Sequence, residues 1–227
     1  MKIIIGLWVT LAFASPVAAQ TALAAADQAS TPPAAASSGP PLVLRGFAMI
    51  TEQRFAAVNT FDAVFGHRME PFVGGGAQVV FRDGVYVELS VSRFRKVGQR
   101  AFRFNGQNFR LGIPLTARLT PVEVAGGYRF AGFARRRVIP FAGGGVGSYS
   151  YTETSDFADS SENVDTRHVG YLAVGGVEFR VHRWVGSSVD AQYTHIPGIL
   201  GVDGISKDAG EDDLGGLAAR FKVVIGR

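Results

Sequence analysis

The four histidines of this chain have the widest chemical repertoire of its side chains. They are His67, His168, His182 and His195, and because the chain has no cysteine, they offer no spacing typical of a zinc site. His168 and His195 each lie close to a threonine, which leaves open a hydrolytic dyad between neighbouring segments. No serine motif accompanies either histidine. We therefore expect no catalytic, cofactor-binding or metal-binding residues, and no enzyme.

A second group of candidates is charged and lies within segments that alternate apolar and polar residues. Glu88, for example, stands between Val87 and Leu89. In an extended segment every second side chain lies on the same face. The charged residues of this kind are Arg45, Glu88, Glu123, Glu178, Arg180, Asp190, Arg220 and Lys222. Because buried charges persist only when they are paired, we expect these eight to form a structural charge network on one enclosed face.

A third group of charges lies in the connections between alternating segments. One connection and its flanks are basic, with Arg93, Arg95, Lys96, Arg100, Arg103 and Arg110, and this group could contact the phosphates of lipopolysaccharide. Two later connections are acidic, with Glu153, Asp156, Asp159, Glu162 and Asp165 in one and Asp203, Asp208, Glu211, Asp212 and Asp213 in the other. We expect weak pairing between the basic and acidic connections. A calcium site is an alternative, although the spacing does not match an EF-hand.

The elements that must position these residues are eight extended segments. They cover residues 43–51, 70–81, 85–95, 116–130, 138–152, 168–181, 185–196 and 214–226. The connections alternate strictly between short (82–84, 131–137, 182–184) and long (52–69, 96–115, 153–167, 197–213). This alternation predicts an antiparallel up-and-down sheet with short turns at one end and long loops at the other.

Residues 100–111, inside the second long connection, predict a hairpin that extends beyond the sheet. Phe102 and Phe104 alternate with Arg103, and Asn105-Gly106 is a favoured type I′ turn. Phenylalanines at such a position must pack on other loops or form an exposed contact patch.

Alternation alone does not say which face of a barrel meets solvent, and a soluble lipocalin-like barrel is the structural rival. Small residues and charges of both signs on the polar face favour a narrow polar interior with lipid outside. Aromatic residues gather toward the segment ends, as interfacial girdles would: Phe72, Phe81, Tyr128, Phe130, Phe141, Tyr149, Tyr151, Trp184 and Tyr193. We therefore predict a membrane barrel.

The N-terminus predicts export. Lys2, the apolar run 3–13 and the small residues before Gln20 indicate a signal peptide over residues 1–19. Residues 20–41 are rich in Ala, Ser, Thr, Pro and Gly, which predicts a disordered periplasmic leader. The barrel domain then covers residues 42–227.

Several motifs carry a resemblance to a known family. They are Arg45-Gly46-Phe47, residues 71–76, residues 126–130, residues 139–147 and the final alternating segment. The region 42–227 resembles the outer-membrane protein β-barrel domain family, the small OmpA- and OmpX-like barrels. The resemblance implies an all-β, eight-stranded antiparallel up-and-down transmembrane β-barrel in the cell outer membrane. Barrels of this family often end on an aromatic residue that the barrel assembly machinery recognises. This chain departs from the family because it ends on Ile225-Gly226-Arg227.

These observations predict an envelope barrel with a plugged polar lumen and a structural, envelope-stabilising or surface-contact role. Alternatives are a narrow channel or ligand conduit, and a barrel enzyme that modifies lipid A. The expected partners are outer-membrane lipids, lipopolysaccharide and, during biogenesis, the barrel assembly machinery. Nucleic acid is not expected, because the net charge of +4 is small and the basic residues are scattered.

Overall fold

The computed structural model describes residues 42–104, 107–130, 137–155, 163–201 and 204–226. The predicted signal peptide (residues 1–19) and the predicted leader (residues 20–41) lie outside the described residues. The same holds for the Asn105-Gly106 turn and for the C-terminal Arg227.

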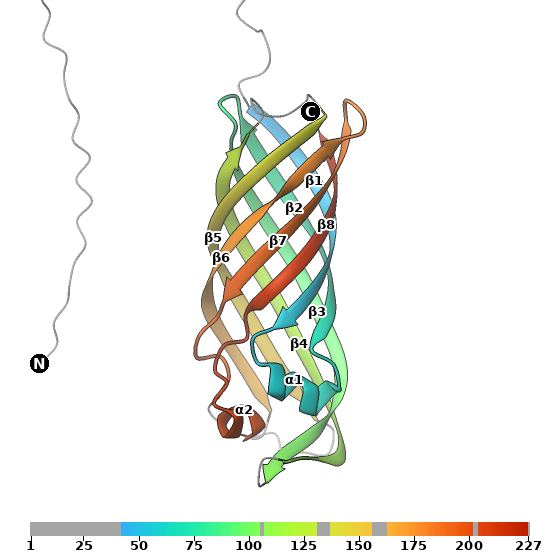
Figure 1. The fold of residues 1–227 in the computed structure, drawn as a ribbon, viewed down its shortest axis with the longest axis vertical. Helices are drawn as coiled ribbons and strands as arrows, with labels where there is room; N and C mark the ends of the chain where they lie inside the picture. The colour runs from blue at the N-terminus through green and yellow to red at the C-terminus, as the bar shows by residue number, and fades with distance from the viewer. Residues whose placement is uncertain (1–41, 105–106, 131–136, 156–162, 202–203, 227) are drawn as a thin grey trace, which may run out of the picture. The chain divides into compact units, whose positions relative to one another are not determined.

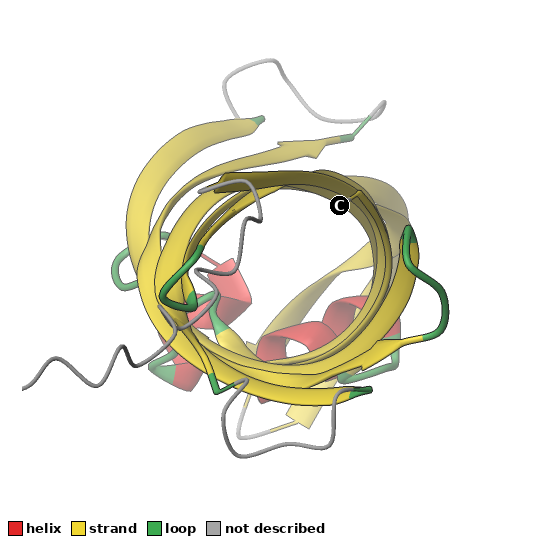
Figure 2. Ribbon diagram, turned by 90° about the horizontal axis from the view of Figure 1, so that it is seen from above, coloured by secondary structure: helices red, strands yellow, loops and turns green. Residues whose placement is uncertain are grey.

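Eight antiparallel strands form a closed ring (Figures 1 and 2). They are β1 (Leu42–Phe55), β2 (Met69–Phe81), β3 (Val85–Phe104), β4 (Gln107–Arg129), β5 (Val138–Thr154), β6 (Val164–Arg180), β7 (Val185–His195) and β8 (Gly216–Gly226). Each strand pairs with its neighbour in sequence, and β8 pairs with β1 to close the ring. The predicted eight-stranded up-and-down barrel is confirmed.

The two ends of the barrel differ, and we call them the turn end and the loop end. The turn end holds the short β2–β3 and β6–β7 connections, the end of β4, the start of β5 and the C-terminal end of β8, at the top of Figure 1. The loop end holds α1 (Val58–Phe65) and α2 (Gly204–Ala209), two helices that the sequence pattern did not predict within the long connections 52–69 and 197–213. Figure 2 shows the helices lying across this end of the ring.

β3 and β4 continue past the other strands as a paired hairpin (Figure 1). The register runs from Ala101 opposite Arg110 to Phe104 opposite Gln107, with an irregularity between Gln99 and Ala101. The predicted hairpin is therefore confirmed in its two arms.

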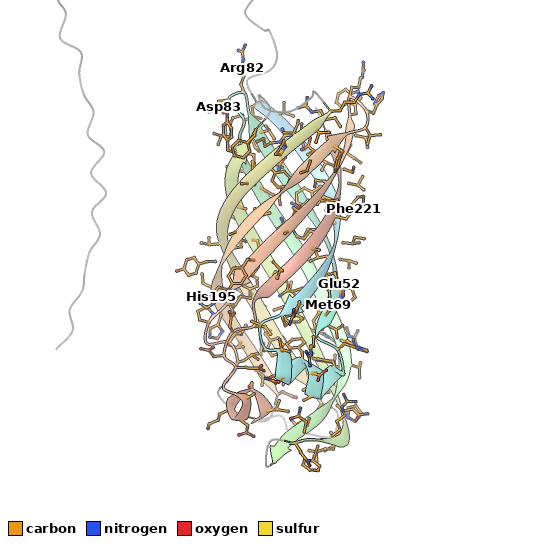
Figure 3. The ribbon with its side chains drawn as sticks, in the orientation of Figure 1. Glu52, Met69, Arg82, Asp83, His195 and Phe221 are labelled. Atoms are coloured by element: carbon orange, nitrogen blue, oxygen red, sulfur yellow. The ribbon has the colours of Figure 1, made fainter. Side chains whose placement is uncertain are left out.

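Alternation sorts the strand residues into an outer apolar face and an inner polar face. In β8, Phe221, Val223 and Ile225 point outward and are 41–60% exposed, whereas Arg220 and Lys222 are buried inside. Figure 3 shows Phe221 pointing away from the barrel. A soluble barrel would have the opposite arrangement, because water would cover its outer face. Neither helix in the described part of the chain is long and apolar enough to cross a membrane.

Glycines permit the narrow interior. A Cβ atom on Gly76 of β2 would lie 2.0 Å from the carbonyl oxygen of Leu89 and 2.7 Å from the ring of Phe47. The absence of a side chain there lets β2 approach β3 and leaves the Phe47 ring its place in the lumen.

The predicted aromatic girdles are correct for some residues and wrong for others. The outward-facing residues are Phe81, Tyr128, Phe130, Trp184 and Tyr193, each at least 36% exposed. The prediction was wrong for Phe72, Phe141, Tyr149 and Tyr151, which are buried inside the barrel. They lie at strand ends, but they share the phase of the inward-facing residues, and phase decides the direction of a side chain in a strand.

Candidate functional site

The lumen near the turn end is organised around Glu178 of β6. Its carboxylate accepts hydrogen bonds from Arg45 Nη1 of β1 at 3.0 Å and from Arg129 Nη2 of β4 at 2.5 Å. The side chains of all three residues are at most 11% exposed. Because β1, β4 and β6 are not neighbours in the ring, these bonds connect strands across the lumen.

The middle of the lumen is organised around Lys222 of β8. Its Nζ lies 2.6 Å from Glu88 Oε1 of β3 and 3.6 Å from Asp190 Oδ2 of β7. The same ammonium group lies 4.9 Å from the centre of the Phe47 ring, a distance typical of a cation–π interaction. Gln78 Nε2 donates to the second oxygen of Glu88 at 3.2 Å. The charge of Lys222 is therefore met on three sides by groups that favour it.

Arg220 of β8 organises the third layer, closest to the loop end. Its guanidinium donates to Asp190 and to Gln192 of β7, and lies 3.9 Å from Glu123 of β4. Glu123 in turn accepts hydrogen bonds from the Tyr149 hydroxyl at 2.7 Å and from Gln192 Nε2 at 3.0 Å. This layer joins four strands in one hydrogen-bonded set.

These three layers form the charge network, which holds four basic and four acidic residues. They are Arg45, Arg129, Arg220 and Lys222, and Glu88, Glu123, Glu178 and Asp190. The structure brings together seven of the eight residues that the sequence predicted for it. The exception is Arg180, which is exposed at the turn end and takes no part in the ion pairs found within the described residues. Strand phase still points Arg180 inward, but it lies where the lumen opens to solvent.

The charge network leaves little free space. Two cavities beside it have volumes of about 20 Å³ and about 10 Å³. A single water needs roughly 10–15 Å³ by the same kind of measure, so each cavity holds about one water. A larger cavity of about 340 Å³ opens at the turn end and is lined by residues that include Arg45, Glu178, Arg180 and His182.

The loop end is filled by a cluster of aromatic and aliphatic side chains, which we call the aromatic cap. Its rings are Phe55, Phe61, Phe65, Phe72 and Phe94, packed with Leu119, Tyr149, Tyr151, Ile196, Ile199 and Leu214. The rings of Phe55 and Phe61 stack with centroids 3.8 Å apart, and those of Phe72 and Phe94 with centroids 5.3 Å apart. Phe61 and Phe65 come from α1, so the helix supplies part of the aromatic cap.

Both ends of α1 are held by charged side chains from distant segments, Glu211 of the β7–β8 connection and Arg110 of β4. Glu211 accepts hydrogen bonds from the backbone N–H groups of Asn59 and Thr60 at 2.9 Å, at the N-terminal end of the helix. Arg110 Nε donates to the carbonyl of Ala63 at 3.0 Å, at the C-terminal end. An anion at the N-terminus and a cation at the C-terminus both complement the helix dipole.

The electrostatic environment of Glu211 reflects this contact. Burial alone would raise the pKa of Glu211, but the hydrogen bonds from Asn59 and Thr60 outweigh burial and hold the pKa below its ordinary value. The prediction that the acidic connections pair with the basic connection is wrong for Glu211, which binds α1. It is also wrong for Asp213, whose carboxylate contacts His195 and the backbone N–H groups of Ile196 and Gly215.

The predicted lipopolysaccharide-contact group is divided between the two faces of the barrel. Lys96 faces inward and its Nζ lies 2.5 Å from Glu70, so it is not available to lipid. Arg110 is bonded to α1. Arg93 and Arg95 face outward and are exposed. Arg100 is half-buried and has a partner within the protein, and the side chain of Arg103 lies outside the described residues.

The histidine dyad that the sequence left open does not form. His168 points toward the interior and lies 3.2 Å from the Thr166 hydroxyl, whereas His195 points outward and lies 2.7 Å from Asp213. The two rings lie on opposite faces because they have opposite strand phases. Within the described residues, no group of His, Cys, Asp or Glu side chains is arranged to hold a metal ion. Asp156, Asp159, Glu162 and Asp203 lie outside those residues.

Sequence reasoning missed Arg129, Gln78 and Gln192 as members of the lumen set. Arg129 follows Glu123 by six positions on the same strand, so the two share a face. The alternation of β4 therefore predicts that Arg129 points into the lumen, as Glu123 does. The aromatic cap was also missed, because its rings come from a helix and several strands that meet only in the folded barrel.

An eight-stranded ring with an apolar outer face and a charge-paired interior defines the class of protein: the fold is that of an outer-membrane β-barrel. Among solved structures, the chain is similar to the outer membrane protein OprG from Pseudomonas aeruginosa, with 12% identity, a TM-score of 0.50, and coverage of 82% of this chain and 95% of that one.

Two further barrels give lower scores. The N-terminal barrel domain of OprF from Pseudomonas aeruginosa has 12% identity, a TM-score of 0.46, and coverage of 81% of this chain and 97% of that one. Neisserial surface protein A has 10% identity, a TM-score of 0.46, and coverage of 82% and 96%. No family model and no curated protein matches the sequence. The closed eight-stranded ring and the match to OprG confirm the resemblance to small outer-membrane barrels as a likeness of fold.

Proposed function

We propose that this protein is a closed, non-enzymatic outer-membrane barrel with a structural, envelope-stabilising or surface-contact role. The observation that carries the proposal is the charge network, in which four basic and four acidic residues pair inside the lumen. Under this proposal the turn end faces the periplasm and the loop end faces the exterior. Its partners are outer-membrane lipids, lipopolysaccharide and, during biogenesis, the barrel assembly machinery.

Two physical arguments support a closed lumen. An eight-stranded barrel has an interior barely wide enough for its own side chains. Passage of an ion would also require paired charges such as Lys222 and Glu88 to separate in a poorly hydrated space, where an unpaired charge is costly. The aromatic cap adds a second, apolar barrier at the loop end.

A narrow channel or ligand conduit is the second candidate, and the cavity of about 340 Å³ at the turn end favours it. Under the leading proposal this cavity is a blind vestibule, because Glu178 and its two arginines close its inner end.

Planar-bilayer recordings separate the two candidates. We expect no stable conductance steps from the wild-type barrel. A variant with Lys222→Ala and Glu88→Ala removes one pair but keeps the layers around Glu178 and Arg220 and the aromatic cap, so it should show no stable steps either. A heat-modifiability gel checks that both proteins are folded. Reproducible conductance steps from the wild-type barrel would contradict the closed barrel.

The non-enzymatic part of the proposal has its own test. His195 and Asp213 form the one His–carboxylate pair found among the described residues, and His195 is exposed on the outer face near the loop end (Figure 3). Within the described residues, no hydrogen bond joins the His195 ring to a Ser or Thr hydroxyl that could serve as a nucleophile. Purified barrel incubated with lipid A should leave its acylation unchanged. If the wild-type barrel changed the acylation of lipid A and His195→Ala did not, an enzymatic role would be indicated instead of a structural one.

A further inference from the structure

Four outward-facing arginines lie where the apolar outer face of the barrel ends toward the loops. They are Arg93 and Arg95 of β3, Arg118 of β4 and Arg167 of β6, and all are exposed. Counted toward the loop end, the arginines lie one or two outward positions beyond Val91, Val122 and Val169, and in β3 one more outward valine, Val97, follows them. We call these four residues the arginine belt.

The belt contains a like-charge pair that the sheet register enforces. Arg95 lies directly opposite Arg118 on adjacent strands, with both side chains on the outer face. Like charges in this position destabilise a sheet. Arg93, Arg95 and Arg118 form no ion pair within the described residues, and Asp165 is the one outward-facing carboxylate that the described parts of β3 to β6 contain. The belt therefore holds an excess of positive charge that this part of the protein does not neutralise.

Hydroxyl groups continue the belt onto β5. Thr152 lies opposite Arg118, and Ser150 lies opposite Arg167. Arg167 Nε donates to Ser150 Oγ at 3.0 Å, which fixes that guanidinium on the surface. Guanidinium forks beside hydroxyl groups provide several N–H and O–H donors, the set that suits a phosphate group.

The depth of the belt indicates which phosphate it meets. The outward residues below it, toward the turn end, are apolar, for example Val91 at 46% exposure and Val169 at 62%. A lipid whose chains contact this apolar band places its phosphates at the edge of the band, where the arginines lie. Charge complementarity and depth together favour a phosphorylated lipid of the outer leaflet over a soluble anion.

We propose that the arginine belt binds the phosphate groups of lipopolysaccharide on the outer face of β3 to β6. The site keeps Arg93 and Arg95 from the sequence-based group, adds Arg118 and Arg167, and excludes Lys96 and Arg110, which bind within the protein. It rests on the proposed placement of the barrel in the outer membrane with the loop end outside, but not on a closed lumen, because the belt is on the outside of the barrel.

One consequence distinguishes this site from a structural role for the same arginines. Without an anion, Arg95 and Arg118 repel each other, so Arg95→Gln or Arg118→Gln leaves the stability of the lipopolysaccharide-free barrel unchanged or raises it. With lipopolysaccharide bound, the same substitutions lower stability, because they remove a contact to the lipid. The sign of the effect therefore reverses with the lipid.

The test uses the full chain, refolded in a nonionic detergent, with bisphosphorylated rough lipopolysaccharide as the probe. Native mass spectrometry gives the affinity and the thermal unfolding midpoint gives the stability. Each basic residue near an anionic surface contributes about 1 kcal/mol, or about a fivefold change in affinity. We expect an approximately 25-fold loss for Arg95→Gln with Arg118→Gln. The matched control, Arg82→Gln with Arg183→Gln, removes two charges at the turn end and should bind as wild type does.

Two further probes identify the chemistry that is bound. Dephosphorylated lipopolysaccharide with the same acyl chains should bind wild type as weakly as the intact lipid binds the double variant. Equal binding of both lipids, or wild-type affinity of the double variant, would overturn the proposal. Binding of soluble heparin that excess lipopolysaccharide does not displace, and that the double variant loses, would assign the belt to a soluble polyanion instead. If the double variant fails to fold in the detergent, Arg167→Gln alone carries the test, with a fivefold loss expected.

Discussion

The lumen and the aromatic cap fill the same barrel with different side chains, charged in the lumen and apolar in the cap. In the lumen, charged side chains such as Lys222 and Glu88 meet across the ring at 2.6 Å. In the cap, apolar rings such as Phe55 and Phe61 stack at 3.8 Å. The lumen residues come from regular strands, whose phase directs them inward, whereas the cap depends on α1 being held by Glu211 of the β7–β8 connection and Arg110 at the loop end of β4.

This difference predicts how each region responds when a substitution removes a contact. A lumen charge that loses its partner stays buried within the rigid ring, so the loss affects the whole barrel. A cap contact that is lost frees a loop that can rearrange, so the loss stays at the loop end. Substitutions should therefore fall into two groups, with global effects from the lumen and local effects from the cap.

The largest effect is expected from Lys222→Met, which leaves Glu88 with only the amide of Gln78 as a neutral partner. Removing one member of a buried pair costs about 3–5 kcal/mol. Urea unfolding of the barrel in lipid vesicles measures this loss. The double variant Lys222→Met with Glu88→Gln should recover part of the loss, since it leaves no unpaired charge. A double variant as unstable as the single one would contradict the pairing.

A charge introduced on the apolar outer face should destabilise the barrel almost as strongly. This allows a comparison between a charge in the lumen and a charge exposed to lipid. Leu89 points outward from β3 and is 49% exposed. Leu89→Arg should cost about 2–4 kcal/mol near the midplane and reduce the fraction of folded, inserted protein. Leu89→Ile, the control, should insert normally. Equal yields for Leu89→Arg and wild type would show that this face does not meet lipid.

A smaller and local effect is expected from Glu211→Gln, which weakens the N-terminal contact of α1 by about 0.5–1 kcal/mol. Because the pKa of Glu211 is lowered in the folded protein, the contact is fully present above the ordinary glutamate pKa of about 4.3 and is lost as the pH falls through the lowered value.

Hydrogen exchange of the α1 amides measures this dependence. Protection in wild type should fall in acid to the level of Glu211→Gln, whose protection should not change with pH over that range. Asp212→Asn, at an exposed neighbouring carboxylate, is the matched control and should behave as wild type. A global loss of protection in Glu211→Gln would show that the cap and the ring unfold together.

The smallest effect is expected from Arg110→Gln, which removes the cation from the C-terminal end of α1. The helix dipole predicts a loss of about 0.3–1 kcal/mol for an exposed charge, restricted to the last turn of the helix. Hydrogen exchange should show faster exchange at the last amides of α1 and no change in the strands. Arg93→Gln, which removes an exposed arginine that does not contact α1, should leave the helix unchanged.

The sequence alone determined the strands and the direction of their side chains. Alternation around Glu88 and Lys222 was sufficient to place both inside the ring, because side-chain direction in a strand is a local property with a period of two. The same rule, applied to Arg129, would have added it to the network, and applied to Phe72 and Tyr149, would have removed them from the predicted girdles.

Only the tertiary structure decided which residues meet. Glu178 binds both Arg45 and Arg129, and Lys96 binds Glu70, because ring closure and register bring these positions together. The tertiary structure also decided that α1 forms. Its sequence is rich in β-branched and aromatic residues, it has no capping side chain of its own, and eight residues are too few for a stable isolated helix. The helix exists because Glu211 and Arg110 bind its ends and its phenylalanines are buried in the cap, contacts that residues 58–65 cannot make by themselves.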